Sequence, residues 1–210
     1  SLRYFTQTRH YLRGAFRSFW ERNGGVGVFG YPITEEYVRG ADGRIVQYFE
    51  RARFELTVNG AQAIVNLGRL GVEVTGSRIF PQVPPFKSYN ARTYFPETGH
   101  SLFGAFKATW ERRGRAAIFG LPISEEINEQ LVDGRWHTVQ YFERARFELW
   151  ADGVRLGLLG RALAPAQLLE PWPAEVAPPG PLNEKGEPHP PAGRPPQPPP
   201  PPPPTGNPSK

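Results

Sequence analysis

The sequence predicts an α+β fold of two tandem repeats, each with helices packed on a small antiparallel β-meander, followed by a polyproline II tail. Three observations lead to this prediction. The stretch VQYFERARFEL occurs at residues 46–56 and again at residues 139–149. Helix and hairpin signals flank both copies in the same order. Most of the 25 prolines fall after residue 164, and proline lacks the amide hydrogen that helices and sheets need.

The repeat sets the predicted domain organisation. Residues 4–70 align with residues 94–162, about 90 residues further on, and NLGRL of the first copy falls against LLGRA of the second. Between the copies, Pro81, Pro84 and Pro85 indicate a stiff, extended connector. The predicted parts are residues 1–76 (repeat unit 1), 77–93 (proline-containing connector), 94–164 (repeat unit 2) and 165–210 (proline-rich extended tail).

Each unit is predicted to open with an amphipathic helix. Thr8 and Thr98 stand where an N-cap belongs, and Gly24 and Gly114 stand where the helix should end. Between them, apolar residues recur at three- and four-residue steps along one face. These residues are Leu12, Ala15, Phe16, Phe19 and Trp20 in the first unit, and Leu102, Ala105, Phe106 and Trp110 in the second.

A second, shorter helix is expected after a Phe-Gly-x-Pro turn. It would open at Thr34-Glu35-Glu36 and at Ser124-Glu125-Glu126, where a hydroxyl caps free amides and carboxylates favour the positive end of the helix. A glycosidase pair is the alternative interpretation of these acids, but adjacent helical residues point apart. His10 and His100 are interpreted as hydrogen-bonded structural residues, because no histidine has the spacing of a metal site.

Strands are predicted to follow the helices. The dipeptides Asp42-Gly43 and Asp133-Gly134 mark turns, and Asn59-Gly60 and Asp152-Gly153 supply the tight turns of hairpins. Between these turns the repeated stretch is predicted as a strand with one buried parity. That parity comprises Val46, Tyr48, Ala52, Phe54 and Leu56.

Composition narrows the classes of function. Cysteine is absent, which excludes disulfides, thiolate zinc sites and cysteine nucleophiles. The net charge is +5, but basic and acidic residues alternate, a pattern typical of a solvated, ion-pairing surface rather than a nucleic-acid groove. No apolar run is long enough for a membrane span. Because the chain opens with SLRYF, without Met, we expect trimming after export.

No nucleophile elbow or phosphate-binding loop occurs, so the sequence predicts no enzyme, no catalytic residue, no metal and no cofactor. Aromatic residues that recur in both copies are predicted to form the core: Phe16, Trp20, Phe29, Tyr48, Phe49 and Phe54. Three tryptophans are peculiar to the C-terminal half, namely Trp136, Trp150 and Trp172. They are candidates either for stacking on a sugar or proline ring or for simple packing.

The repeated stretch also keeps its outward-facing charges, which should drift if only water touched them. Two interpretations stay open: an ion-pair lattice within each unit, or a docking surface for the neighbouring unit, another subunit or a glycan. The arginines concerned are Arg51, Arg53, Arg144 and Arg146.

The pattern WERNGGVGVFGYPITEE…DG…VQYFERARFEL…NG…VNLG resembles the LGFP repeat of secreted, cell-wall-associated bacterial proteins, over residues 20–68 and 110–160. Phe-Gly-Tyr-Pro and Phe-Gly-Leu-Pro replace the usual Leu-Gly-x-Pro of that family, and Ala52 and Ala145 stand where it often has glycine. The resemblance implies an extracellular, non-catalytic module associated with the cell envelope, and it transfers no catalytic residue.

Two functions follow as expectations, both at an extracellular or cell-surface location. The first is a structural subunit of a self-assembling fibre or layer, in which the proline tail docks head-to-tail on a neighbouring copy. The docking segment would be Pro198, Pro199, Pro200, Pro201, Pro202, Pro203 and Pro204. The alternative is a module that anchors the protein to envelope polysaccharide, with the tail as a spacer. Neither involves nucleic acid or a membrane span.

Overall fold

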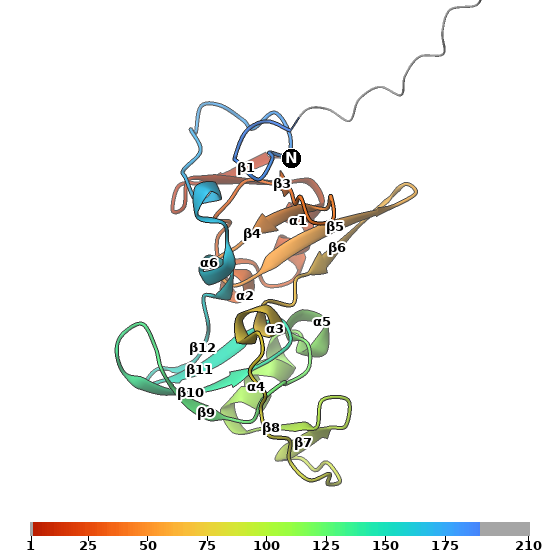
Figure 1. The fold of residues 1–210 in the computed structure, drawn as a ribbon, viewed down its shortest axis with the longest axis vertical. Coiled ribbons are helices and arrows are strands. Elements are labelled where there is room, and N and C mark those ends of the chain that lie inside the picture. The colour runs from red at the N-terminus through yellow and green to blue at the C-terminus, as the bar shows by residue number, and fades with distance from the viewer. Residues whose placement is uncertain (1, 190–210) are drawn as a thin grey trace, which may run out of the picture.

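The computed structural model describes residues 2–189, and it has a mixed α+β fold with small antiparallel sheets. Its two halves, residues 2–75 and residues 92–163, lie one above the other along the long axis (Figure 1). Elements follow the same order in both: a hairpin, two helices, a four-stranded sheet and a short helix. None of the helices within residues 2–189 has the length and apolar character needed to cross a bilayer.

Each half opens with a hairpin rather than a helix. Strands β1 (Leu2–Phe5) and β2 (His10–Arg13) pair antiparallel, as do β7 (Arg92–Phe95) and β8 (His100–Phe103). The prediction of Thr8 and Thr98 as N-caps is therefore wrong, because both lie in the hairpin turns. Leu12 lies four residues before Phe16, as in a helix, but it belongs to strand β2 and is buried from there.

The helices are α1 (Gly14–Arg22) and α2 (Gly25–Phe29) in the first half, and α4 (Gly104–Arg113) and α5 (Arg115–Phe119) in the second. The second helix thus precedes the Phe-Gly-x-Pro turn, and its prediction at residues 34–36 and 124–126 is wrong. Instead of capping helices, the hydroxyls of Thr34 and Ser124 accept hydrogen bonds from the amides of Tyr48 (3.1 Å) and Tyr141 (2.9 Å). A hydroxyl satisfies a strand amide as well as a helical one.

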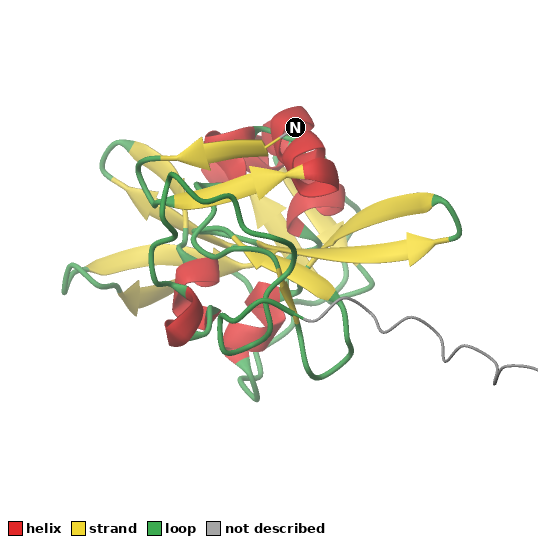
Figure 2. Ribbon diagram, turned by 90° about the horizontal axis from the view of Figure 1, so that it is seen from above, coloured by secondary structure: helices red, strands yellow, loops and turns green. Residues whose placement is uncertain are grey.

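The sheets are the predicted antiparallel meanders. The first contains β3 (Tyr37–Val38), β4 (Ile45–Tyr48), β5 (Arg53–Asn59) and β6 (Gln62–Leu67) in sequential order. The second contains β9 (Ile127–Gln130), β10 (Trp136–Tyr141), β11 (Arg146–Trp150) and β12 (Gly153–Leu156). Figure 2 shows the longest hairpin projecting from the body. The hairpin turns lie at residues 60–61 and 151–152, each one position from the predicted dipeptides Asn59-Gly60 and Asp152-Gly153.

The repeated stretch is a hairpin and not one strand. In the first half it forms β4, a turn at residues 49–52 and β5, with the amide of Phe49 donating to the carbonyl of Ala52 at 2.8 Å. In the second half Phe142 and Ala145 make the same bond at 2.8 Å. The prediction of a single strand with every second residue buried is therefore wrong, because the turn reverses the chain within the stretch.

Two short helices cross between the halves. Helix α3 (Leu70–Thr75) touches the turn at residues 142–145, and α6 (Leu159–Leu163) touches the turn at residues 49–52. The amide of Val72 donates to the carbonyl of Glu143 at 3.2 Å, and that of Arg161 donates to the carbonyl of Glu50 at 3.1 Å. Each repeated turn is therefore a docking point for the other half.

The contacts of these two helices show that the sequence alignment of the two copies is wrong at its C-terminal end. A Cβ at Gly71 would overlap the carbonyl oxygen of Phe142, and one at Gly160 would overlap that of Phe49, so these two glycines correspond. The alignment of NLGRL with LLGRA pairs Gly68 with Gly160 instead. It is displaced because the β11–β12 hairpin is shorter than the β5–β6 hairpin.

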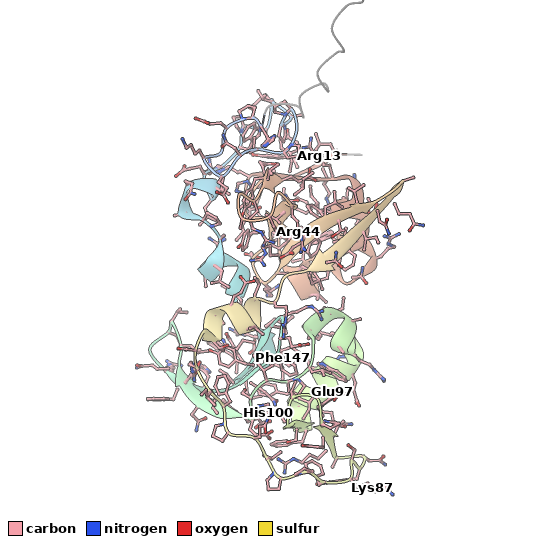
Figure 3. The ribbon with its side chains drawn as sticks, turned by 45° about the vertical axis from the view of Figure 1, so that its right-hand side comes forward. Arg13, Arg44, Lys87, Glu97, His100 and Phe147 are labelled. Carbon is pink, nitrogen blue, oxygen red and sulfur yellow. The ribbon has the colours of Figure 1, made fainter. Side chains whose placement is uncertain are left out.

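The aromatic core prediction is confirmed. All six predicted residues are at most 5% exposed, and they are Phe16, Trp20, Phe29, Tyr48, Phe49 and Phe54. One continuous cluster joins the aromatic residues of both halves, including Phe54 and Phe147. Figure 3 shows Phe147 in the interior of the second half.

Residues 165–189, here called the C-terminal arm, fold back against the first half, beside which they lie in blue in Figure 1. The predicted extended tail is therefore wrong for this part. The arm begins with a 3-10 helix (Ala166–Leu168), and Leu168 and Leu182 are buried against the first half, which gives it the apolar anchor that the proline content concealed. The segment from Pro198 to Pro204 lies outside the described residues.

The connector covers the second half as the arm covers the first. The amide of Val83 donates to the carbonyl of Gly99 at 3.0 Å, and the amide of Trp172 donates to that of Arg9 at 2.9 Å. Both bonds join a residue that directly precedes a proline to the turn of a hairpin. Arm and connector therefore occupy corresponding places on the two halves.

Candidate ligand-binding groove

The charged side chains that recur in both copies of the repeated hairpin form ion pairs within each half. The guanidinium of Arg53 donates to Glu55 Oε1 through Nε (2.9 Å) and Nη2 (2.6 Å). Arg146 makes the corresponding bonds to Glu148 Oε1 at 3.0 Å and 2.6 Å. Of the two interpretations, the ion-pair lattice describes Arg53 and Arg146.

The other two arginines lie where the halves meet. Arg51 donates to the carbonyl of Val26 and Arg144 to that of Ala116, both at 2.8 Å. Arg144 also reaches across to the carbonyl of Leu67 in the first half, at 3.3 Å. Burial lowers the pKa of Arg51 from its ordinary value. The second interpretation, docking on the neighbouring unit, therefore describes Arg144, while Arg51 lines a small cavity between the halves together with Arg144 and Ile118.

A groove of about 670 Å³ opens beside this junction, between the second sheet and α6. Strand β11 directs alternate side chains to it, and Arg155 joins them from β12 opposite Glu148. Four arginines and one carboxylate line it, so the groove is cationic. The charged and aromatic lining residues are Arg51, Arg113, Arg146, Arg155, Glu148 and Trp150.

Trp150 is held in a fixed position in this groove. Its ring lies 4.0 Å from that of His137, and the guanidinium of Arg155 lies 4.3 Å from its centroid. The indole N–H donates to Glu148 Oε2 at 2.9 Å. A hydrogen bond with Asp133 raises the pKa of His137. The groove therefore contains a pre-positioned aromatic group, which lowers the ordering cost of binding.

The structure does not bring the three candidate tryptophans together. Trp136 is 71% exposed and stands next to His137 in β10, so it lies on the opposite face of the sheet from Trp150. Trp172 belongs to the C-terminal arm, where its indole N–H donates to the carbonyl of Val176 at 2.6 Å. Of the three, only Trp150 lines the groove.

The paired acids have structural partners. Glu35 accepts a hydrogen bond from the amide of Tyr11 at 2.9 Å and lies 3.3 Å from Nδ1 of His10. Glu125 accepts from the amide of Ser101 at 2.6 Å. Their prediction as first-turn helix acids is wrong, because they tie the N-terminal hairpins to the sheets. Within residues 2–189, no group of three or more His, Asp or Glu residues is arranged to hold a metal ion.

Sequence reasoning missed two arginines of the groove, Arg113 and Arg155. Both replace asparagines of the first half: Arg113 follows Trp-Glu-Arg where Asn23 does, and Arg155 lies opposite Glu148 where Asn66 lies opposite Glu55. The difference between the copies was the available signal. For Arg113 the alignment at Trp-Glu-Arg was sufficient, whereas for Arg155 the correct hairpin register was needed, which the sequence alignment did not provide.

Comparison with known proteins found no family model that matches the chain and no similar curated protein. The function is therefore argued from the groove and its chemistry. The resemblance of the sequence pattern to LGFP repeats stays a prediction.

Proposed function

We propose that the chain is a non-catalytic, extracellular module of two tandem LGFP-like repeats that binds cell-envelope polysaccharide. The observation that carries this proposal is the groove of about 670 Å³ beside α6, with its fixed indole and four arginines. The resemblance of the sequence to LGFP repeats supports the cell-envelope setting. The proline-rich segment after the folded body would act as a spacer.

The lining suits a sugar chain. Guanidinium groups present several N–H donors in a planar fork, which matches hydroxyl and carboxylate oxygens. Apolar side chains beside them, such as exposed Leu158 and Val132, suit the apolar face of a sugar ring. The groove thus offers polar and apolar contacts over one continuous surface.

The test is binding to purified cell-wall polysaccharide, measured by pull-down and by calorimetry with soluble fragments. Trp150→Ala should weaken binding at least about tenfold, as expected for loss of a central aromatic contact. Trp136→Ala is the matched control, since it removes the same side chain from the other face and should leave the affinity unchanged. Failure of the parent chain to bind any envelope polysaccharide would end the proposal.

A second candidate is the structural subunit of a cell-surface fibre or layer, and the docked C-terminal arm favours it. The arm adds Leu182 to Tyr37 as a β-bridge, and Tyr11 and Arg13 donate to carbonyls of Ala174 and Pro178. A neighbouring copy could supply an arm that makes the same contacts, because such exchange costs little. The proposed docking segment from Pro198 to Pro204 would then extend this contact.

Light scattering over a wide concentration range, followed by electron microscopy, tests this candidate. Head-to-tail exchange should give a mass that rises with concentration, ending in rings or filaments. A monomeric mass at every concentration would exclude it. Polysaccharide binding by such a monomer would leave the first proposal standing.

A further inference from the structure

Arg53 and Arg146 occupy corresponding places, but the two halves complete their surroundings differently. Each lies on the sheet two residues before a glutamate that it binds, and each has a tyrosine hydroxyl near Nη1, at 3.1 Å from Tyr48 and 3.5 Å from Tyr141. In the first half, helix α3 adds a second carboxylate. Glu73 accepts from Nη1 and Nη2 of Arg53 at 2.8 Å and 2.7 Å, which is a two-pronged pair.

The second half has no counterpart of this carboxylate. Gly71 and Gly160 dock in the same way, so the residue two positions later is Glu73 in α3 and Ala162 in α6. The side chain of Arg146 is accordingly 19% exposed, against 7% for Arg53. Arg146 and Ala162 both line the groove. The outer edge of the guanidinium therefore faces open space where Arg53 meets Glu73.

We propose that the groove binds the carboxylate of an acidic sugar residue, such as a uronic acid, and that this carboxylate takes the place on Arg146 that Glu73 takes on Arg53. The inference rests on the proposed function and names its ligand class. The same arrangement already occurs once in the chain, because Arg53 binds Glu73 while it also binds Glu55 and the hydroxyl of Tyr48.

The charges around Arg146 favour an anion. Arg51, Arg113 and Arg155 line the same groove. Two carboxylates oppose these arginines. Glu148 already accepts from Arg146 and from the Trp150 indole, and Asp152 accepts from Arg155 at 3.2 Å and 2.8 Å. A carboxylate entering the groove thus meets an excess of guanidinium groups, which bind carboxylates in the planar, two-pronged way that ammonium groups do not.

The experiment compares Ala162→Glu with Ala162→Gln by titration calorimetry. Ala162→Glu supplies the missing carboxylate from within the chain, whereas Ala162→Gln adds nearly the same volume without charge. The probes are an oligogalacturonate, a neutral glucose oligomer of equal length and an oligoglutamate peptide. The parent should bind the oligogalacturonate at least about tenfold more tightly than the other two. Ala162→Glu should lose this preference, and Ala162→Gln should keep most of it.

A second measurement does not depend on the folding of a variant. Binding of the oligogalacturonate to the parent should weaken steadily as salt is raised, since exposed charge pairs are screened. Equal affinity of the parent for acidic and neutral oligomers, or equal weakening by the two substitutions, would overturn the inference. Equal binding of oligoglutamate would overturn the sugar assignment.

These outcomes separate the inference from the proposed function. A parent that binds envelope polysaccharide but prefers neutral oligomers would keep the function and exclude the carboxylate site. A parent that binds oligogalacturonate but no envelope polysaccharide would exclude the proposed function while the carboxylate site on Arg146 stands.

Discussion

Gln47 shows why the polar residues of the repeated stretch are identical in both copies. Its side chain is fully buried, and Nε2 donates to the carbonyls of Tyr11 (2.7 Å) and Thr34 (2.8 Å). Gln140 makes the same pair of bonds in the second half. A buried amide that loses such partners destabilises the fold by about 1–3 kcal/mol, so substitution of this glutamine is strongly destabilising. The face that should have met water is covered by the N-terminal hairpin.

Gly160→Ala tests the contact between α6 and the repeated turn. The new Cβ would overlap the carbonyl oxygen of Phe49, which is backbone and has little room to move. Overpacking of this kind costs about 1–3 kcal/mol, and urea unfolding should show that loss. Gly180→Ala is the control, because nothing lies within 4 Å of its Cβ position. Equal stability of the two variants would refute this account of the contact.

The ion-pair lattice predicts a pH dependence through Glu55. Burial alone would raise the pKa of its carboxyl, but the hydrogen bonds and charges of Arg53, Arg39 and Arg44 together outweigh burial and hold the pKa below its ordinary value of about 4.5. A lowered carboxyl pKa stabilises the fold above that ordinary value, and this contribution is lost as pH falls through the lower, folded-state pKa. Glu55→Gln should therefore lose less unfolding free energy than the parent between pH 6 and pH 3. An equal loss in both would contradict the lattice.

At the scale of the element, the short helices exist because of what they touch. Helix α6 spans only Leu159–Leu163, and a helix of this length is not stable by itself in water. Leu159 is buried against the first half, and the C-terminal arm continues from the same helix with Leu168 and Leu182. Helix and arm therefore form one strap from the second half across the first.

Leu182→Ala should weaken this strap. The side chain is 4% exposed, and truncating a buried leucine to alanine costs about 2–5 kcal/mol. Val176→Ala removes an exposed side chain of the same arm and should cost less than about 0.5 kcal/mol. Chemical unfolding measures both, and limited proteolysis shows whether the arm opens first. A loss for Leu182→Ala no greater than for Val176→Ala would mean that the arm is not anchored there.

At the scale of the whole molecule, the two halves are joined by a shared core. Phe54 of the first half and Phe147 of the second belong to one cluster, and α3 and α6 dock reciprocally on the repeated turns. A continuous core of this kind couples the unfolding of its parts. The halves should therefore behave as one cooperative unit.

Phe54→Ala tests that coupling. Phe54 is fully buried among four other phenylalanine rings, and its truncation costs about 3–5 kcal/mol. Calorimetry should show a single transition, moved as a whole to lower temperature. A second transition that stays at the parent temperature would show that the second half folds independently.

The sequence by itself determined the local features of this protein. Turn dipeptides located the hairpin turns at residues 60–61 and 151–152 to within one residue, and the recurring aromatic residues identified the core, because turn chemistry and side-chain hydrophobicity act over a few residues. Only the tertiary structure decided that Gln47 is buried, that Gly71 and Gly160 dock on the opposite half, and that the C-terminal arm returns to the first half. The groove at Arg146 likewise depends on Ala162, the structural counterpart of Glu73. The sequence alignment does not pair these two residues, because the hairpins before them differ in length. These features arise from contacts between residues far apart in the chain, and such pairings leave no signal in the local pattern of either partner.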